Sequence, residues 1–188
     1  MPPTHHPSGL AVPIRLPPPL GRLRRHWDRA ARAGAQPHVT ILFPFLPTSA
    51  LSIDVRVSLA SIAAAVEPVD VTFRRVRRFD EGVVWIEPEP AEPFRRLTAA
   101  VVERWPDHLP YGGLFDELIP HLTVVEADGD EPPLGTIEEV VASHLPFTAR
   151  ADRLESWRQD PDGRWRQHWR LRLGRVRPRR GVQVSAEG

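Results

Sequence analysis

Apolar and polar positions along the chain follow two different periods, and the switches between them predict an order of strands and helices. Period-two alternation and β-branched residues predict strands at 10–16, 38–45, 69–79, 83–87, 121–127, 147–157 and 164–173. Apolar residues at a period near 3.6 predict helices at 20–33, 52–66, 92–105 and 136–144. Prolines and glycines fall between these segments, where they end helices and start turns. Strands and helices mixed in this order indicate an α+β fold.

The order of elements repeats across the chain. Each half has a strand, a helix and a strand hairpin, at 38–45, 52–66 and 69–87 in the first half and at 121–127, 136–144 and 147–173 in the second. A pseudo-two-fold axis between similar halves would bring strands 38–45 and 121–127 together at the centre. We therefore predict a bilobal α+β fold: two pseudo-symmetric halves, each with an antiparallel sheet and flanking helices, around a central cleft.

Length and composition fit one domain with short tails. The 188 residues are 41% hydrophobic, which is typical of a globular protein, and we expect a single bilobal domain at 8–174. Residues 1–7 are predicted to be a flexible N-terminus, and 175–188 a basic disordered tail. The uncharged run 33–53 is broken by three prolines and by polar residues, so no membrane segment is expected. Without a signal peptide, the prediction is a cytoplasmic protein.

The missing residue types exclude several kinds of chemistry. The chain has no cysteine, so a thiolate nucleophile and a zinc–thiolate site are excluded. It also has no lysine, which excludes a P-loop and a ligase that forms a lysyl-adenylate. The net charge is only +1, so any contact with nucleic acid has to be local.

One short motif occurs twice, once in each half. Residues 37–43 read PHVTILF, and residues 120–126 read PHLTVVE. In a strand, alternate side chains share a face, so His38 and Thr40 point the same way while their neighbours point into the core. His121 and Thr123 do the same in the second half. Two strands related by a two-fold would present two imidazoles and two hydroxyls to one cleft.

That set of side chains suits phosphodiester chemistry without a metal. A neutral histidine accepts a proton from the attacking oxygen, and a protonated one donates a proton to the leaving oxygen. The threonine hydroxyls can donate to the non-bridging oxygens. A structural polar pair is the alternative for either motif alone, but the repetition argues against it. A two-histidine metal site is a second alternative, which the motif does not favour because it has no acidic residue and threonine is a poor ligand.

The twin motifs resemble the His-x-Thr signatures of the two-histidine (2H) phosphoesterase superfamily, above all the bacterial 2′-5′ RNA ligase-like and cyclic phosphodiesterase proteins. The resemblance spans about residues 8–174, including the PYGG loop before the second motif. It implies His38, Thr40, His121 and Thr123 as the catalytic set, with His121 as base, His38 as acid and no metal or other cofactor. Members of the ligase type often carry a basic residue where this chain has Glu126, a departure that weakens RNA binding there.

Other candidates for substrate contact lie outside the motifs. Tyr111 precedes two glycines, and its loop is expected near the second histidine, where it would bind a phosphate or a base; a plain turn is the alternative. Phe43 and Phe45 could stack on a base, but their parity with Val39 and Ile41 puts them in the core instead. Two basic groups are either nucleic-acid contacts or solvated faces: a cluster at Arg74, Arg75, Arg77 and Arg78, and a stripe at Arg164, Arg166, His168, Arg170 and Arg172.

The function expected from these features is hydrolysis of 2′,3′-cyclic phosphate ends of nucleotides or RNA by two-histidine acid/base catalysis. An ATP-independent 2′-5′ RNA ligase would use the same site, with a 5′-hydroxyl in place of water. A non-catalytic nucleotide- or RNA-binding module is the alternative from a different class. The sequence does not distinguish these three, and the oligomeric state is equally open.

Overall fold

The computed structural model describes residues 6–115, 118–126 and 134–175 and confirms the α+β class. Its strands are β1 (Ser8–Pro13), β2 (His38–Leu42), β3 (Val69–Arg78), β4 (Val83–Glu89), β5 (Leu122–Glu126), β6 (Phe147–Ala151), β7 (Arg153–Gln159) and β8 (Trp165–Arg172). Its α-helices are α1 (Pro18–Trp27), α2 (Arg29–Arg32), α3 (Ile53–Ala64), α4 (Glu92–Arg104) and α5 (Leu134–Ala142). Two 3-10 turns, η1 (Thr48–Ala50) and η2 (Pro110–Gly113), complete the described elements.

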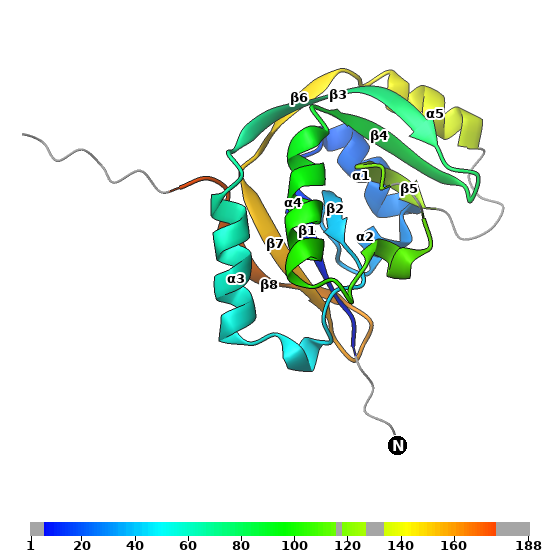
Figure 1. Ribbon diagram of the computed structural model, residues 1–188. Helices are drawn as coiled ribbons and strands as arrows, with labels where there is room; N and C mark the ends of the chain where they lie inside the picture. The colour runs from blue at the N-terminus through cyan, green and yellow to red at the C-terminus, as the bar shows by residue number, and fades with distance from the viewer. Residues whose placement is uncertain (1–5, 116–117, 127–133, 176–188) are drawn as a thin grey trace, which may run out of the picture.

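The strands form one curved antiparallel sheet of eight, in the order β6-β3-β4-β5-β2-β1-β7-β8 (Figure 1). The two motif strands, β2 and β5, are neighbours at its centre, as the repeat predicted. We call β2-β1-β7-β8 lobe 1 and β5-β4-β3-β6 lobe 2. Helices α3 and α4 pack on lobe 1, whereas α1 and α5 pack on lobe 2. The bilobal arrangement is therefore present, with the two sheets of the prediction joined edge to edge.

The hairpins belong to the opposite lobes from those the sequence suggested. The β3–β4 hairpin follows the first motif strand in sequence but pairs with β5. The predicted 147–173 hairpin is split, because β6 pairs with β3 while β7 pairs with β1 and β8. The spatial repeat is thus strand–helix–motif strand–helix, formed by β1-α1-β2-α3 and β4-α4-β5-α5. Sheet partners are chosen by non-local register, which a linear pattern does not encode.

Two predicted elements are interrupted at aspartates. The single helix expected at 20–33 breaks at Asp28, whose backbone is extended and whose carboxylate accepts a hydrogen bond from the Ala31 amide at 2.6 Å. Asp28 is therefore the N-cap of α2, a role in which aspartate is strongly favoured. The strand expected at 147–157 likewise breaks at Asp152, where the chain crosses from β6 in lobe 2 to β7 in lobe 1.

The core lies behind the motif strands. Val39 and Ile41 of β2 are fully buried, and the Ile41 carbonyl accepts a 2.9 Å hydrogen bond from the buried Thr98 hydroxyl of α4. Figure 1 shows α4 lying across β2 in lobe 1. The core prediction is confirmed for Phe45, which is 3% exposed, but wrong for Phe43, which is half-buried. β2 ends at Leu42, so its alternation does not extend to Phe43.

The predictions for the termini fall mainly outside the described residues, since 1–5 and 176–188 are not described. The single-domain boundaries at 8–174 remain a prediction. Within the described part of the chain, no helix combines the length and the apolar character needed to cross a bilayer.

Helix α3 offers a matched test of the core. The helix packs on β8 and α4; its Leu59 is fully buried, whereas its Val57 is 62% exposed. We expect Leu59→Ala to lower the free energy of unfolding by about 2–5 kcal/mol, because it leaves a cavity in a packed interior. Val57→Ala is expected to change it by less than about 0.5 kcal/mol. Urea denaturation followed by circular dichroism measures both, and equal effects would contradict the packing described here.

Candidate active site

A cavity of about 1190 Å³ lies between the lobes, and its walls include all five residues singled out from the sequence. These are His38, Thr40, Tyr111, His121 and Thr123. They come from β2, from η2 and from the start of β5, so segments distant in sequence meet in one place. The cavity is large enough for a nucleotide-sized ligand.

The register between the central strands brings the two motifs together. β2 and β5 are antiparallel, with Val39 opposite Leu122. On either side of that pair, antiparallel geometry places His38 beside Thr123 and Thr40 beside His121. The two histidines are then diagonal neighbours on one face of the sheet, about 7–8 Å apart. Each imidazole is thus next to the hydroxyl of the other motif, and the space between the rings suits one phosphate group.

Both imidazoles are anchored in the same way. The Nδ1 atom of His38 lies 2.6 Å from the Gln36 carbonyl oxygen, and that of His121 lies 2.7 Å from the Ile119 carbonyl oxygen. A carbonyl only accepts, so each Nδ1 carries the proton and donates it. In a neutral ring, Nε2 is then the free acceptor. The repeat therefore supplies two rings of the same tautomer, each anchored two residues back along its own chain.

The surroundings of His38 favour the neutral ring. Burial lowers its pKa from 6.5 to about 4, although the hydrogen bond to the Gln36 carbonyl works in the opposite direction. The positive charge of Arg24 and the ring of His121 lower the pKa further. At neutral pH the His38 ring is therefore uncharged.

His121 has a different neighbourhood. Its ring packs against Phe79 and Trp85, with ring centroids 5.1 and 5.7 Å away. Burial lowers its pKa, while the hydrogen bond to the Ile119 carbonyl and the negative charge of Glu126 raise it. The two halves of the repeat therefore differ in electrostatics: a cation lies near His38, and a carboxylate lies near His121.

Tyr111 reaches the first motif from the loop before the second. Its backbone adopts a left-handed conformation, with φ of 52°, and its amide donates to the Phe43 carbonyl at 2.6 Å. Its hydroxyl is hydrogen-bonded to the side chain of Thr40, and burial raises its pKa. The phenol therefore stays protonated and lies beside one of the two threonine hydroxyls.

Arg24 and Asp28 form a buried pair at the same cavity, which the sequence analysis did not identify. Their side chains are 3.2 Å apart and at most 4% exposed. The Arg24 guanidinium also donates to the Ala35 and Thr123 carbonyls, at 2.7 and 3.2 Å, and so bridges the residues leading into β2 to β5. The available signal was the i,i+4 spacing of opposite charges within a predicted helix. The pattern alone does not reveal this burial, because the apolar residues of 20–33 predict one continuous helix and arginine side chains are mostly exposed.

The family model of the 2′-5′ RNA ligase superfamily matches residues 12–163, which include both motifs and nearly every described element. The chain belongs to this superfamily. The match confirms the resemblance to 2H phosphoesterases drawn from the two His-x-Thr motifs.

Solved structures of low sequence identity share the fold. The protein TT0787 of Thermus thermophilus matches with a TM-score of 0.59 and 17% identity, covering 90% of this chain and 100% of that one. The LigT protein of E. coli, solved in complex with NADP+, and a chain described as a phosphoesterase both match with a TM-score of 0.50 and 18% identity. Each of these covers 90% of this chain and 99% of the other. No curated protein matches the sequence.

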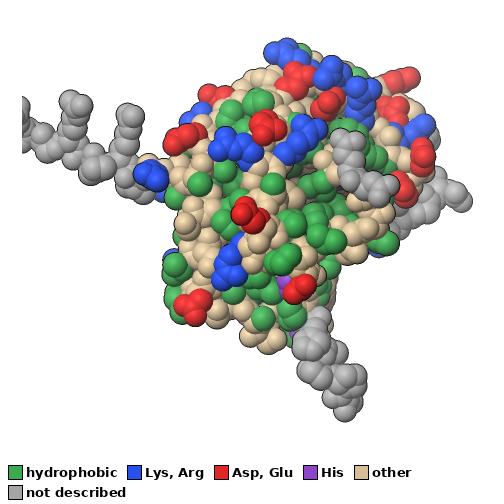
Figure 2. Space-filling view, in the orientation of Figure 1, with side chains coloured by type: hydrophobic (Ala, Val, Ile, Leu, Met, Phe, Trp, Pro, Cys, Tyr) green, Lys and Arg blue, Asp and Glu red, His purple; other side chains and the backbone are tan. Residues whose placement is uncertain are grey.

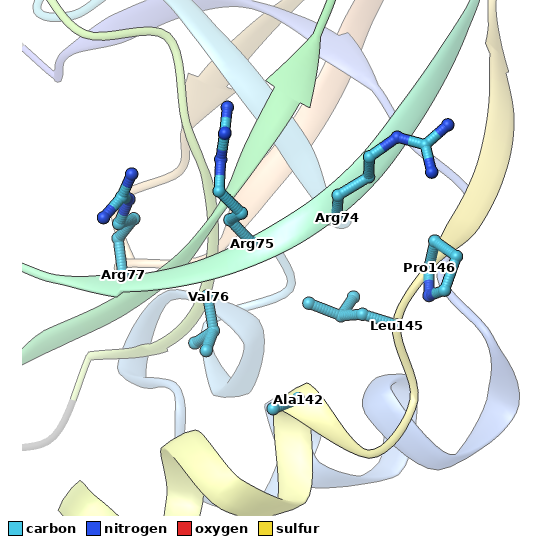
Figure 3. A pocket seen from close by; sticks show the side chains of 7 residues that line it. All are labelled: Arg74, Arg75, Val76, Arg77, Ala142, Leu145 and Pro146. Atoms are coloured by element: carbon cyan, nitrogen blue, oxygen red, sulfur yellow. The ribbon is translucent and has the colours of Figure 1, made fainter.

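For a member of the 2′-5′ RNA ligase superfamily, the basic groups on β3 and β8 are obvious candidates for an RNA path, but both are balanced by acids. On β3, Arg75 lies 2.8 Å from Glu87 and 2.7 Å from Glu89. Figure 3 shows Arg74, Arg75 and Arg77 of β3, which line a small pocket together with Val76 and Leu145 and extend to the opposite side of the strand from Val76. Figure 2 shows blue and red side chains intermingled across the top of the molecule.

The arginines of the β8 stripe lie in solvent on an edge strand, and three of the four pair with carboxylates. Arg166 contacts Asp160 at 3.1 Å, and Arg170 contacts the buried Glu155 at 3.4 Å. Exposed pairs of this kind are worth little energy, but they neutralise the field that would attract a phosphate backbone.

Within the described residues, no group of three or more His, Asp or Glu side chains is arranged to hold a metal ion.

The low pKa of His38 can be tested directly by proton NMR. Titration of its ring is expected to have a midpoint near pH 4 rather than at the ordinary 6.5. Because the folded state then binds fewer protons than the unfolded state, the free energy of unfolding should fall as pH decreases from 6.5 towards 4. His38→Gln should remove part of this dependence of the free energy of unfolding on pH. A midpoint at or above 6.5 would contradict the burial described here.

Proposed function

We propose that this protein is a metal-independent phosphodiesterase that hydrolyses 2′,3′-cyclic phosphate ends of nucleotides or RNA. The main support is the arrangement of two neutral imidazoles, each with an unprotonated Nε2, beside two threonine hydroxyls at one cavity. Such a pair can exchange protons with the attacking and leaving oxygens of one phosphorus atom. Membership of the 2′-5′ RNA ligase superfamily is consistent with this reaction class.

The charges around the two rings favour one assignment of the general base and the general acid. His38, next to Arg24, stays neutral and acts as the general base. The bound phosphate raises the pKa of both rings, and His121, next to Glu126, takes up the proton first and acts as the acid. This is the reverse of the assignment implied by the family resemblance, and it rests on the neighbours of each ring in this chain.

In the proposed reaction, each imidazole transfers one proton. His38 Nε2 accepts a proton from water as the water oxygen forms a bond to phosphorus, and the bond from phosphorus to the 3′-oxygen breaks. His121 Nε2 gives its proton to that oxygen, so the product is a 2′-phosphate with a free 3′-hydroxyl. Thr40 and Thr123 donate to the non-bridging oxygens, each worth about 2–4 kcal/mol if aligned with the transition state. The Tyr111 hydroxyl orients Thr40.

The first test is loss of function at the motif histidines. We expect His38→Ala and His121→Ala each to lower kcat for a 2′,3′-cyclic nucleotide by about 10²–10⁴, because each removes one proton transfer. His26→Ala, an exposed histidine outside the cavity, is the matched control and should keep full activity. Turnover should persist in excess EDTA. Loss of activity in EDTA would revive the metal alternative, and binding without turnover would indicate a binding module.

A second test separates base from acid. An aryl phosphodiester has a leaving oxygen that needs no proton, so it makes the general acid dispensable. If His121 is the acid, His121→Ala should lose less than about tenfold on the aryl substrate but at least about 10² on the cyclic nucleotide. His38→Ala should remain impaired on both. The opposite pattern would restore the assignment implied by the resemblance.

RNA halves ending in a cyclic phosphate and a 5′-hydroxyl, supplied to the wild type, would reveal any ligation.

A further inference from the structure

The cavity has few charges available for a polyanion. Among the described residues that line it, four carboxylates stand against three guanidiniums. Each guanidinium is already near a carboxylate: Arg24 at 3.2 Å from Asp28, Arg29 at 3.2 Å from Glu126, and Arg78 at 3.3 Å from Glu138. The remaining acids, Asp80 and Glu81, lie at the β3–β4 turn on the cavity rim. Binding of a nucleic-acid strand depends on cations that replace its counterions, and this rim would repel further phosphates.

Aromatic rings line the lobe 1 side of the same cavity. Phe43, Trp157 and Trp165 are all half-buried and face the cavity, and we call these three the aromatic wall. Phe43 and Trp165 are in edge-to-face contact, with ring centroids 5.7 Å apart. A side chain at Gly9, opposite Trp157 on β1, would meet the Phe43 ring at 3.2 Å, so glycine leaves room for that ring.

Hydrogen bonds restrain both tryptophans of the aromatic wall, Trp157 through its ring and Trp165 through its backbone. The Trp157 indole donates to the buried carboxylate of Glu155 at 3.1 Å, and Glu155 is itself held by Arg153 at 2.9 Å. The Trp165 amide donates to the Ala33 carbonyl at 2.8 Å, which ties the start of β8 to the end of α2. Rings fixed in advance lose little entropy when a ligand stacks on them.

Strand geometry sets the distance from the wall to the reacting centre. Thr40 lies beside Ala11 on β1, and Gly9 shares the face of Ala11 two residues further along. Trp157, opposite Gly9 on β7, is two strand spacings across from β2 and so about 12 Å from Thr40. The Phe43 ring lies against Gly9, one strand spacing across and two residues along, and is therefore about 8 Å from Thr40. This is the scale of one ribose between a phosphate and its base. A base on the aromatic wall would therefore leave its cyclic phosphate between His38 and His121.

We propose that the site takes a small substrate with one phosphate and one aromatic base, a 2′,3′-cyclic mononucleotide, in preference to an RNA end. This inference rests on the proposed hydrolase function and specifies its substrate class. The base stacks on the aromatic wall, the singly charged cyclic phosphate meets the hydroxyls and imidazoles, and no subsite for a second phosphate is required.

Three substrates test the proposal: cyclic 2′,3′-AMP, ribose 2′,3′-cyclic phosphate without a base, and a short oligoribonucleotide ending in the same adenosine cyclic phosphate. Loss of the base should lower kcat/KM about 5- to 100-fold, mainly through KM, since stacking is the interaction removed. The oligonucleotide should be no better than the mononucleotide. Between about 50 and 300 mM salt, kcat/KM for cyclic AMP should change less than about twofold. A better oligonucleotide with strong salt dependence would overturn the proposal.

Variants of the wall give a second readout. Trp157→Ala and Trp165→Ala should raise KM for cyclic AMP about 5- to 100-fold while leaving KM for the base-free substrate unchanged. Trp105→Ala, a half-buried tryptophan outside the cavity, is the matched control and should alter neither value. Equal effects of the wall variants on both substrates would contradict a stacking role.

Absence of turnover with all three substrates would defeat the proposed function but not decide the substrate class. In that case, calorimetry with adenosine 2′-phosphate and ribose phosphate decides it. Tighter binding of the nucleotide, lost in Trp157→Ala, would uphold the aromatic subsite, and equal or absent binding would overturn it.

Discussion

The pairing of β2 with β5 is the contact on which the site depends. It is short, with Val39 opposite Leu122, yet it joins the two lobes and sets the spacing of the two motifs. The Arg24 guanidinium reinforces it by reaching carbonyls at the entry to β2 and within β5. The four motif side chains take their positions from this junction, because they project from the two paired strands.

Burial at the junction keeps both imidazoles neutral, and it also makes their charged forms costly. A charged imidazole is disfavoured in a poorly solvated site, so both histidine pKa values are lowered. The anchoring of each Nδ1 leaves one defined acceptor per ring. The repeat alone would give two equivalent rings. Arg24 and Glu126 remove that equivalence, since they place opposite charges near the two histidines.

The lobes share a fold but present different surfaces to the cavity. Lobe 1 contributes the aromatic wall, and lobe 2 contributes acids at the β3–β4 turn. The arginine-rich strands β3 and β8, which are the most basic features of the sequence, carry out local ion pairing instead. Nearby carboxylates neutralise much of the arginine charge on these strands. The lining of the cavity is itself close to neutral.

The sequence by itself determined the local features of the molecule. Alternation fixed which face of each motif strand carries His38, Thr40, His121 and Thr123, because side chains on a strand alternate whatever the partner strand. Repetition of the motif predicted that the two strands meet at the centre. Tertiary structure alone decided which lobe receives each hairpin, since strand pairing is a choice among distant segments. It also decided the burial of Arg24 and the place of Phe43 and Trp157 at the cavity. Those depend on where strands end, bulge and approach one another in space, and no periodicity along the chain records that.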